Sequence, residues 1–239
     1  MKNPRESLNS HSFKKVFLKI YHFMLSEHGP QGWWPLTCEI SGRGYHPGKF
    51  LFPKTRQGRL EVCLGAILTQ NTAWTNVEKA LAQLKAQGAL QPEGLLKIPD
   101  GSLEVLIQPA GYFRQKARYI KAILQWFQSY DGQAKAMETE QLRESLLACK
   151  GVGPETADSI LLYAYGKPSF VVDAYTRRIF SALGLVKADW PYARIQEMFH
   201  RSLPNEVFLF QEYHALIVEH AKRHYGRKPE SPCPLQGIF

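Results

Sequence analysis

Asp173 is a carboxylate placed where charge-stabilising chemistry could occur. It follows an apolar run, residues 170–172, and precedes a segment from Ala174 onward that has the spacing of a helix. A carboxylate in this position can stabilise positive charge that develops on a substrate, and it can orient or deprotonate a nucleophile. Aspartate is also a favoured helix N-cap, so a structural role is the alternative, and both roles can hold together.

A glycine hairpin lies upstream of Asp173. Residues 151–154 read Gly-Val-Gly-Pro, between two segments of helical pattern at 139–149 and 154–165. Glycines at 151 and 153 supply the permissive backbone of a sharp reversal, and a proline suits the first helical position because its missing N–H would have no partner there. Backbone N–H groups at such a helix start can hold a phosphate.

The hairpin, followed by Val-Val-Asp-x-x-x-Arg-Arg at residues 171–178, resembles the motif of a known superfamily. This is the helix-hairpin-helix, Gly/Pro-rich, aspartate motif of the DNA glycosylases that include endonuclease III. The resemblance covers roughly residues 59–235. It implies an all-α, two-lobed fold with the active site in the cleft between the lobes, Asp173 as the catalytic residue, and double-stranded DNA with damaged bases as the partner.

DNA contacts are also implied by the resemblance. In the family, the loop that matches residues 69–72 (Thr-Gln-Asn-Thr) carries a glutamine that enters the DNA stack where the target base has left, which here would be Gln70. Spacing alone favours a simple turn. The implied DNA-binding residues are Gln70, Asn71, Lys150, Gly151, Val152, Gly153 and Thr156.

Glu155 is a departure from the bifunctional members of the family. Those members carry a lysine two positions after the second glycine of the hairpin, and its amine attacks the sugar to form a Schiff base. Here that position holds Glu155, whereas Lys150 lies before the hairpin and is expected to face phosphate. We therefore expect a monofunctional glycosylase, a hydrolase that uses water.

Tryptophans provide the candidate pocket for the damaged base. Trp33, Trp34 and Pro35 lie in a Gly/Pro loop, and Trp74 follows the residue 69–72 loop. A similar pattern marks the 3-methyladenine DNA glycosylases of the endonuclease III type, so we expect Trp74 and Trp33 or Trp34 to sandwich an alkylated, cationic purine. The alternatives are a core anchor for these rings, a glycosylase for oxidised or mismatched pyrimidines, and a catalytically silent DNA-binding protein.

The C-terminal tail resembles the family's iron–sulfur loop but retains only Cys233 of four cysteines. One thiolate does not hold a cluster that needs four ligands, so we expect no metal and no cofactor. The other cysteines are far apart in the sequence, with no pattern of disulfides, and those at 63 and 149 are expected to be buried thiols.

Composition agrees with a nucleic-acid partner. The chain has 239 residues, a net charge of +9 and a pI near 9.4, and such basicity favours an anionic partner. No apolar run is long enough to cross a bilayer and no cleavable leader is evident, so we expect a cytoplasmic monomer with no membrane partner.

Helical periodicity dominates the rest of the chain, and we find no strand pattern. We expect an N-terminal helix at 12–27, whose aromatic stripe is core, and a long loop at 36–58. The expected organisation is an N-terminal part (1–58) that packs on the C-terminal lobe, a helical lobe with the hairpin (59–170), and a C-terminal lobe (171–239). Basic residues at 114, 116, 118 and 121 face either DNA or solvent.

Overall fold

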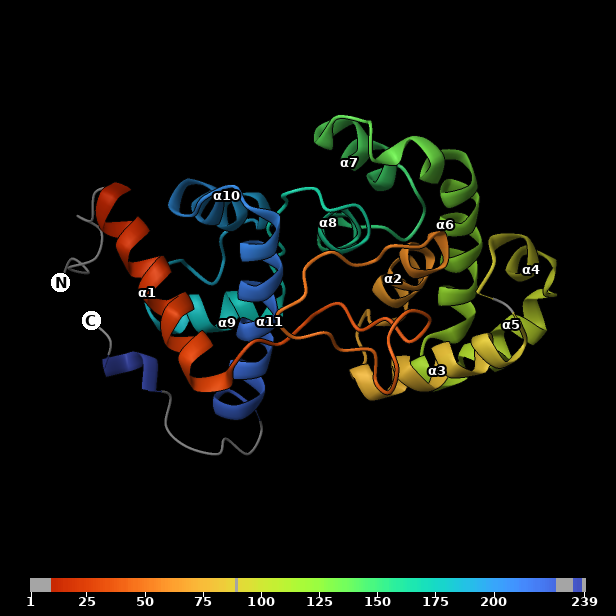
Figure 1. The fold of residues 1–239 in the computed structure, drawn as a ribbon, viewed down its shortest axis with the longest axis horizontal. Helices are drawn as coiled ribbons and strands as arrows, with labels where there is room; N and C mark the ends of the chain where they lie inside the picture. The colour runs from red at the N-terminus through yellow and green to blue at the C-terminus, as the bar shows by residue number, and fades with distance from the viewer. Residues whose placement is uncertain (1–9, 89, 227–233, 238–239) are drawn as a thin grey trace. The chain divides into compact units, whose positions relative to one another are not determined.

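The computed structural model describes residues 10–88, 90–226 and 234–237, and these residues form helices and no strand (Figure 1). The all-α prediction is therefore confirmed. The α-helices are α1 (Ser10–His28), α2 (Arg56–Leu68), α3 (Trp74–Ala86), α4 (Pro92–Lys97), α5 (Asp100–Ile107), α6 (Phe113–Ala134), α7 (Thr139–Leu147), α8 (Pro154–Ala164), α9 (Ala174–Ala182), α10 (Tyr192–Ser202) and α11 (Val207–His224); two short 3₁₀ helices are η1 (Gln108–Ala110) and η2 (Pro234–Gly237).

The chain divides into two compact units. Unit 1 contains residues 1–33, 46–50 and 168–239, and unit 2 contains residues 34–45 and 51–167. The boundary near residue 168 lies close to the expected one. The N-terminal boundary differs, because most of the long loop belongs to unit 2 rather than to the C-terminal helices.

A buried carboxylate explains that difference. Glu61 on α2 is fully buried, and its carboxylate accepts hydrogen bonds from the backbone N–H of Thr37 at 2.9 Å and of Cys38 at 3.0 Å. The Thr37 hydroxyl donates a third bond at 2.5 Å. A buried charge is tolerated only when it is fully hydrogen-bonded, so these bonds fix the loop to α2.

Helix α2 is the central helix of unit 2 and packs against α6 and α8. Every residue from Leu60 to Leu68 is buried, so this part of the helix is covered on all sides. It begins at Arg56, where the Thr55 hydroxyl caps it by accepting from the N–H of Gly58 at 3.0 Å.

Unit 1 is built on an aromatic core shared by α1, α9, α10 and α11, and Figure 1 shows α1 beside α11. Phe17 of α1 is fully buried, and its ring centroid lies 4.9 Å from that of Phe199 and 5.1 Å from that of Phe180. Phe170 stacks on Phe199 at 3.8 Å. The expected core role of the aromatic residues in the N-terminal helix is confirmed at Phe17.

One local prediction in unit 2 is wrong. Lys116 faces neither DNA nor solvent: it is 2% exposed and donates to the carbonyls of Leu68 and Ala110, both at 2.8 Å. Lysine usually keeps its ammonium group in water. Here the long side chain reaches two carbonyl groups at helix ends, and these replace water as hydrogen-bond acceptors.

Within the described part of the chain, no helix is long and apolar enough to cross a membrane.

Candidate active site and DNA-binding residues

Asp173 is the N-cap of α9, and its carboxylate is almost fully committed to contacts within unit 1. One carboxylate oxygen, Oδ1, accepts from the backbone N–H of Thr176 at 2.7 Å and from its hydroxyl at 2.8 Å. The other oxygen, Oδ2, lies 3.7 Å from Nε2 of His214 on α11. The cap therefore uses Oδ1 only, and Oδ2 faces His214.

The surroundings of Asp173 favour the ionised form. Burial alone would raise the pKa of this carboxyl, but the neighbouring His214 and the bonds from Thr176 outweigh burial, so the pKa lies below its ordinary value. An ionised carboxylate at neutral pH suits the stabilisation of positive charge or the activation of water. It does not suit protonation of a leaving group.

His214 connects Asp173 to a predicted pocket residue. The Trp33 ring contacts the His214 imidazole edge-on, with centroids 5.9 Å apart and planes at 86°. The Lys222 ammonium lies 5.8 Å from the Trp33 ring centroid. His214 thus contacts both Asp173 and Trp33, which the sequence placed in separate roles. The sequence analysis did not single out this histidine. The signal for His214 was a histidine in a helical stretch that carries Gln211 and Glu212 among apolar residues.

The loop that carries Trp33 is held by a second buried carboxylate. Glu212 on α11, 3% exposed, accepts from the N–H of Gln31 at 2.5 Å. The adjacent Gly32 has a φ of +67°, and a Cβ there would lie 2.1 Å from the backbone nitrogen of Pro47. Only glycine fits this position, so the loop reaches Trp33 in one defined conformation.

Trp34 is a core anchor rather than one face of a base sandwich. Its side chain is 4% exposed, and a Cβ on Gly65 of α2 would lie 3.1 Å from the indole. Its ring lies 5.2 Å from that of Trp74 with planes at 89°. A base between two rings needs parallel faces separated by two contact distances of about 3.5 Å each. The expected Trp34–Trp74 sandwich is therefore wrong, and Pro35 is buried with Trp34. The Trp33–Trp74 pairing stays a prediction.

The hairpin adopts the expected course between α7 and α8. Gly151 has a φ of +88°, which favours glycine, and Pro154 is the first residue of α8. Gly153 is the N-cap with φ −93° and ψ 179°, an extended backbone that any residue adopts, so its expected conformational need is wrong. It is exposed with nothing within 4 Å of a built Cβ. The helix start without a side-chain cap offers its N–H groups to an anion.

The residue 69–72 loop, which carries Gln70, contacts the hairpin within unit 2. The Gln70 side-chain amide donates to the Gly151 carbonyl at 2.9 Å and to the Thr156 hydroxyl at 3.0 Å. Asn71 is exposed with a φ of +53°, a conformation that asparagine tolerates better than most residues. Lys150 is exposed, and Val152 is buried beneath the turn. Gln70 thus joins its loop to the hairpin through two hydrogen bonds.

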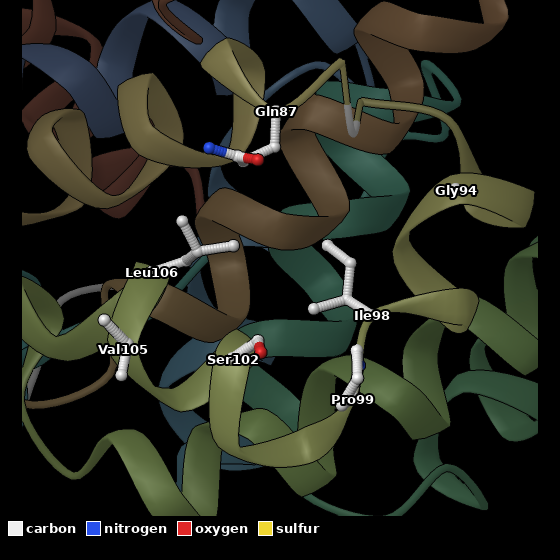
Figure 2. A pocket seen from close by; sticks show the side chains of 7 residues that line it. All are labelled: Gln87, Gly94, Ile98, Pro99, Ser102, Val105 and Leu106. Carbon is white, nitrogen blue, oxygen red and sulfur yellow. The ribbon is translucent and has the colours of Figure 1, made fainter.

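Two cavities lie away from these residues. One of about 500 Å³ is lined by α4, α5 and the end of α3, and Figure 2 shows its largely apolar wall, which includes Ile98, Val105 and Leu106. Another, of about 820 Å³, lies in unit 1 beside Trp190 and Arg194. Neither includes Asp173, the hairpin or the tryptophans discussed above.

The family model of HhH-GPD superfamily base excision DNA repair proteins matches residues 64–205, more than half of the chain. The chain belongs to this superfamily. A Methanocaldococcus jannaschii protein that carries the name DNA repair glycosylase MJ1434 is 39% identical over 235 residues, which cover 96% of this chain and 97% of that protein. The endonuclease III of Sulfolobus acidocaldarius is 30% identical over 70% of this chain and 74% of its own length. The protein is thus a base excision repair DNA glycosylase.

Solved structures agree with the fold. The Helicobacter pylori 3-methyladenine DNA glycosylase MagIII, bound to 1,N6-ethenoadenine, is similar with a TM-score of 0.65 and 26% identity, over 90% of this chain and 98% of that chain. A non-covalent endonuclease III–DNA complex is similar with a TM-score of 0.70 over 94% of both chains, and at 20% identity it supports the fold alone.

The donors for an iron–sulfur cluster do not fit. The predicted remnant of the cluster loop, with Cys233, lies outside the described residues. The three other cysteines belong to unit 2, where Cys63 is fully buried within α2. Burial raises the pKa of the Cys149 thiol to about 11, which disfavours the thiolate.

Proposed function

We propose that this glycosylase hydrolyses the N-glycosidic bond of alkylated purines, 3-methyladenine in particular, and leaves the DNA strand intact. The observation that carries the proposal is the ionised Asp173, whose Oδ2 is left over from capping. Breakage of the glycosidic bond places positive charge on the sugar, and a carboxylate stabilises that charge. Water then adds to the sugar carbon as the base leaves with the bonding electrons, and the proton released from the water passes to Asp173 or to solvent.

An alkylated purine suits a site without a strong acid. Alkylation at N3 makes adenine cationic, so the departing base becomes neutral without protonation. Asp173, with its lowered pKa, is a poor proton donor and a good charge stabiliser. The similarity to MagIII, a 3-methyladenine glycosylase, supports the same substrate class.

Cleavage of the strand requires an amine nucleophile, and the position that would supply it holds Glu155. This residue is exposed in the first turn of α8. A carboxylate there forms no Schiff base with the sugar. The proposal is therefore a monofunctional enzyme that releases the base and leaves an abasic site.

The direct test is to identify the released base. The purified protein is incubated with methylated DNA and, separately, with duplexes that carry an oxidised pyrimidine, uracil or a mismatched thymine, and the products are identified by mass spectrometry. We expect 3-methyladenine release with intact strands before any heat or alkali step. Faster release of a pyrimidine would replace the substrate assignment, and binding without any release would make the protein a silent DNA binder.

Trp74 is the residue we assign to stacking on the damaged base. It is half-buried at the first position of α3, where Trp34 contacts it edge-on. We expect Trp74→Ala to lower 3-methyladenine excision about 10- to 100-fold, since base–aromatic stacking contributes about 1–3 kcal/mol. Trp74→Phe should retain most of the activity.

Thermal unfolding of both variants is the control. If Trp74 serves only to cover Trp34, Trp74→Ala will lower the melting temperature and all DNA binding together. A stable Trp74→Ala protein with full excision would remove Trp74 from the pocket.

A further inference from the structure

Three histidines gather at one end of unit 1. His28 is the last residue of α1, and His220 and His224 lie one turn apart near the end of α11. One ring nitrogen from each lies within 4.8 Å of the other two. We call these three residues the histidine cluster. The contacts described above for Asp173, the hairpin and the tryptophans use none of them.

We propose that the histidine cluster is a site for a divalent transition metal such as Zn²⁺ or Ni²⁺. Imidazole nitrogen is a preferred ligand of these ions, and a pair of histidines four residues apart on a helix places both rings on one face. Three imidazoles leave one coordination position for water. The ion would join the end of α1 to α11.

The distances are close to those that coordination needs. Nε2 of His28 lies 2.9 Å from Nδ1 of His220, a hydrogen-bond distance. Two nitrogens bound tetrahedrally to one Zn²⁺ at 2.0–2.1 Å lie about 3.3 Å apart. The pair therefore needs to open by only a few tenths of an ångström, and the third ring, on His224, has its centroid 4.4 Å from that of His220.

Nearby charges are balanced around the cluster. Arg223, between the two α11 histidines, opposes a bound cation, but its guanidinium pairs with Glu219 at 2.8 Å. Glu27 precedes His28 on α1. His220 is fully buried, whereas His28 and His224 are half-buried, which gives an ion a path of entry. A set of nitrogen donors without carboxylates favours Zn²⁺, Ni²⁺ or Cu²⁺ over Mg²⁺ and Ca²⁺.

The role of the ion would be structural. His220 is six residues beyond His214 on the same helix, which is about 9 Å along its axis. Metal binding should therefore stabilise unit 1 against unfolding by mass action, without a part in breaking the glycosidic bond. The proposal is independent of which base the enzyme releases.

The test is metal titration of the tag-free protein after removal of metals with a chelator. Zn²⁺ binding is measured by calorimetry, and Co²⁺ serves as a spectroscopic probe whose visible bands report nitrogen coordination. We expect one equivalent of metal and a higher melting temperature in its presence. His224→Gln should weaken binding at least about 100-fold, more than the loss of an outer-shell partner, whereas His22→Gln, at an exposed position on α1, should bind as the wild type does.

Several results would overturn the proposal: no binding by the wild-type protein, no effect of metal on its melting temperature, or unchanged binding by His224→Gln. In those cases the cluster is only a hydrogen-bonded contact between two helices. Circular dichroism verifies that His224→Gln is folded, and His28→Gln is the second variant. Should both variants fail to fold, the stoichiometry and Co²⁺ spectrum of the wild type and His22→Gln still decide.

Discussion

At the scale of single residues, this protein uses its buried charged groups in different ways. Asp173 divides its two oxygens between a helix cap and a histidine, and the pKa falls below its ordinary value. Lys116 is buried beside two carbonyls, and burial lowers its pKa to about 8. The first arrangement keeps a negative charge beside His214, whereas the second places a lysine where it links the carbonyl groups of two helix ends.

Asp173→Asn separates the structural role of this residue from its catalytic role. Asparagine caps helices about as well as aspartate, so the melting temperature should change little. It supplies no negative charge to the sugar, so base release should fall by at least about 100-fold. Single-turnover excision and thermal unfolding are measured on the same preparation. An active Asn variant would reduce Asp173 to a cap.

Lys116→Met tests the cost of the buried ammonium group through pH. Between pH 8 and the ordinary lysine pKa of 10.5, the unfolded chain keeps a proton that the folded protein has lost. The unfolded state then binds more protons, so this residue makes stability rise with pH. Methionine has no such proton. The stability of the wild type relative to Lys116→Met should therefore increase by about 1–3 kcal/mol from pH 7 to pH 10.

Urea unfolding at several pH values measures that difference. The same substitution at Lys97, which is exposed, is the control for general effects of charge. A difference between the wild type and Lys116→Met that stays constant with pH would contradict the burial of this charge.

At the scale of elements, the hairpin and the loop before α2 show how short segments are held. The hairpin is joined to the residue 69–72 loop through Gln70, and the loop at 36–38 is held by Glu61. Each bond links segments far apart in the sequence. The hairpin and the residue 69–72 loop, which we assign to DNA contact, are thus hydrogen-bonded to each other within unit 2.

The two hairpin glycines should behave differently on substitution. A Cβ at Gly151 would lie 2.1 Å from the Tyr119 ring, at a φ of +88°, so Gly151→Ala should destabilise the fold by about 1–3 kcal/mol. Gly153 is open, so Gly153→Leu should fold normally. If the backbone N–H groups of the hairpin hold a phosphate, Gly153→Leu should weaken binding to every duplex about tenfold. This factor corresponds to the loss of one hydrogen bond to a charged group.

Binding to undamaged duplexes of different sequence, measured over a range of salt concentrations, reports this effect. Release of counterions makes binding fall with salt in the wild type. Gly153→Leu with normal binding, or wild-type binding that is insensitive to salt, would remove the hairpin from the DNA-binding surface.

At the scale of the whole molecule, the two units carry different parts of the proposed chemistry. Unit 1 holds Asp173 with His214 and Trp33, whereas unit 2 holds the hairpin, Gln70 and Trp74. Our proposal requires both to act on the same nucleotide. The chain's charge of +9 supports attraction to the phosphate backbone as a whole and does not select one base.

Glu155→Lys tests whether the units cooperate on one nucleotide. An amine at this position of unit 2 should attack the sugar carbon that Asp173 of unit 1 stabilises, and borohydride should then trap a protein–DNA adduct. The wild type and Glu155→Gln should give none. Adding Asp173→Asn to Glu155→Lys should abolish trapping, because the base is no longer released.

Gel electrophoresis of the reduced products measures trapping. A robust adduct with the wild-type protein would contradict the monofunctional assignment. A Glu155→Lys variant that excises normally but forms no adduct would place residue 155 away from the sugar.

The sequence by itself determined the helical class, most helix positions and the superfamily, because these depend on local signals. Periodic apolar residues, Pro154 at a helix start and the motif around Asp173 can each be seen within a short window. The bounds of α7 and α8 accordingly lie within two residues of the expected 139–149 and 154–165.

The tertiary structure alone decided which buried charged groups are paired and which tryptophan packs in the core. Contacts such as His214 with Asp173, Glu61 with Thr37 and the perpendicular packing of Trp34 on Trp74 join residues far apart along the chain. No periodicity encodes such contacts, since they depend on how helices pack in three dimensions. Lys116 shows the consequence: a basic residue on a helix appears solvent-facing in the sequence, and only the folded chain supplies the two carbonyls that bury it.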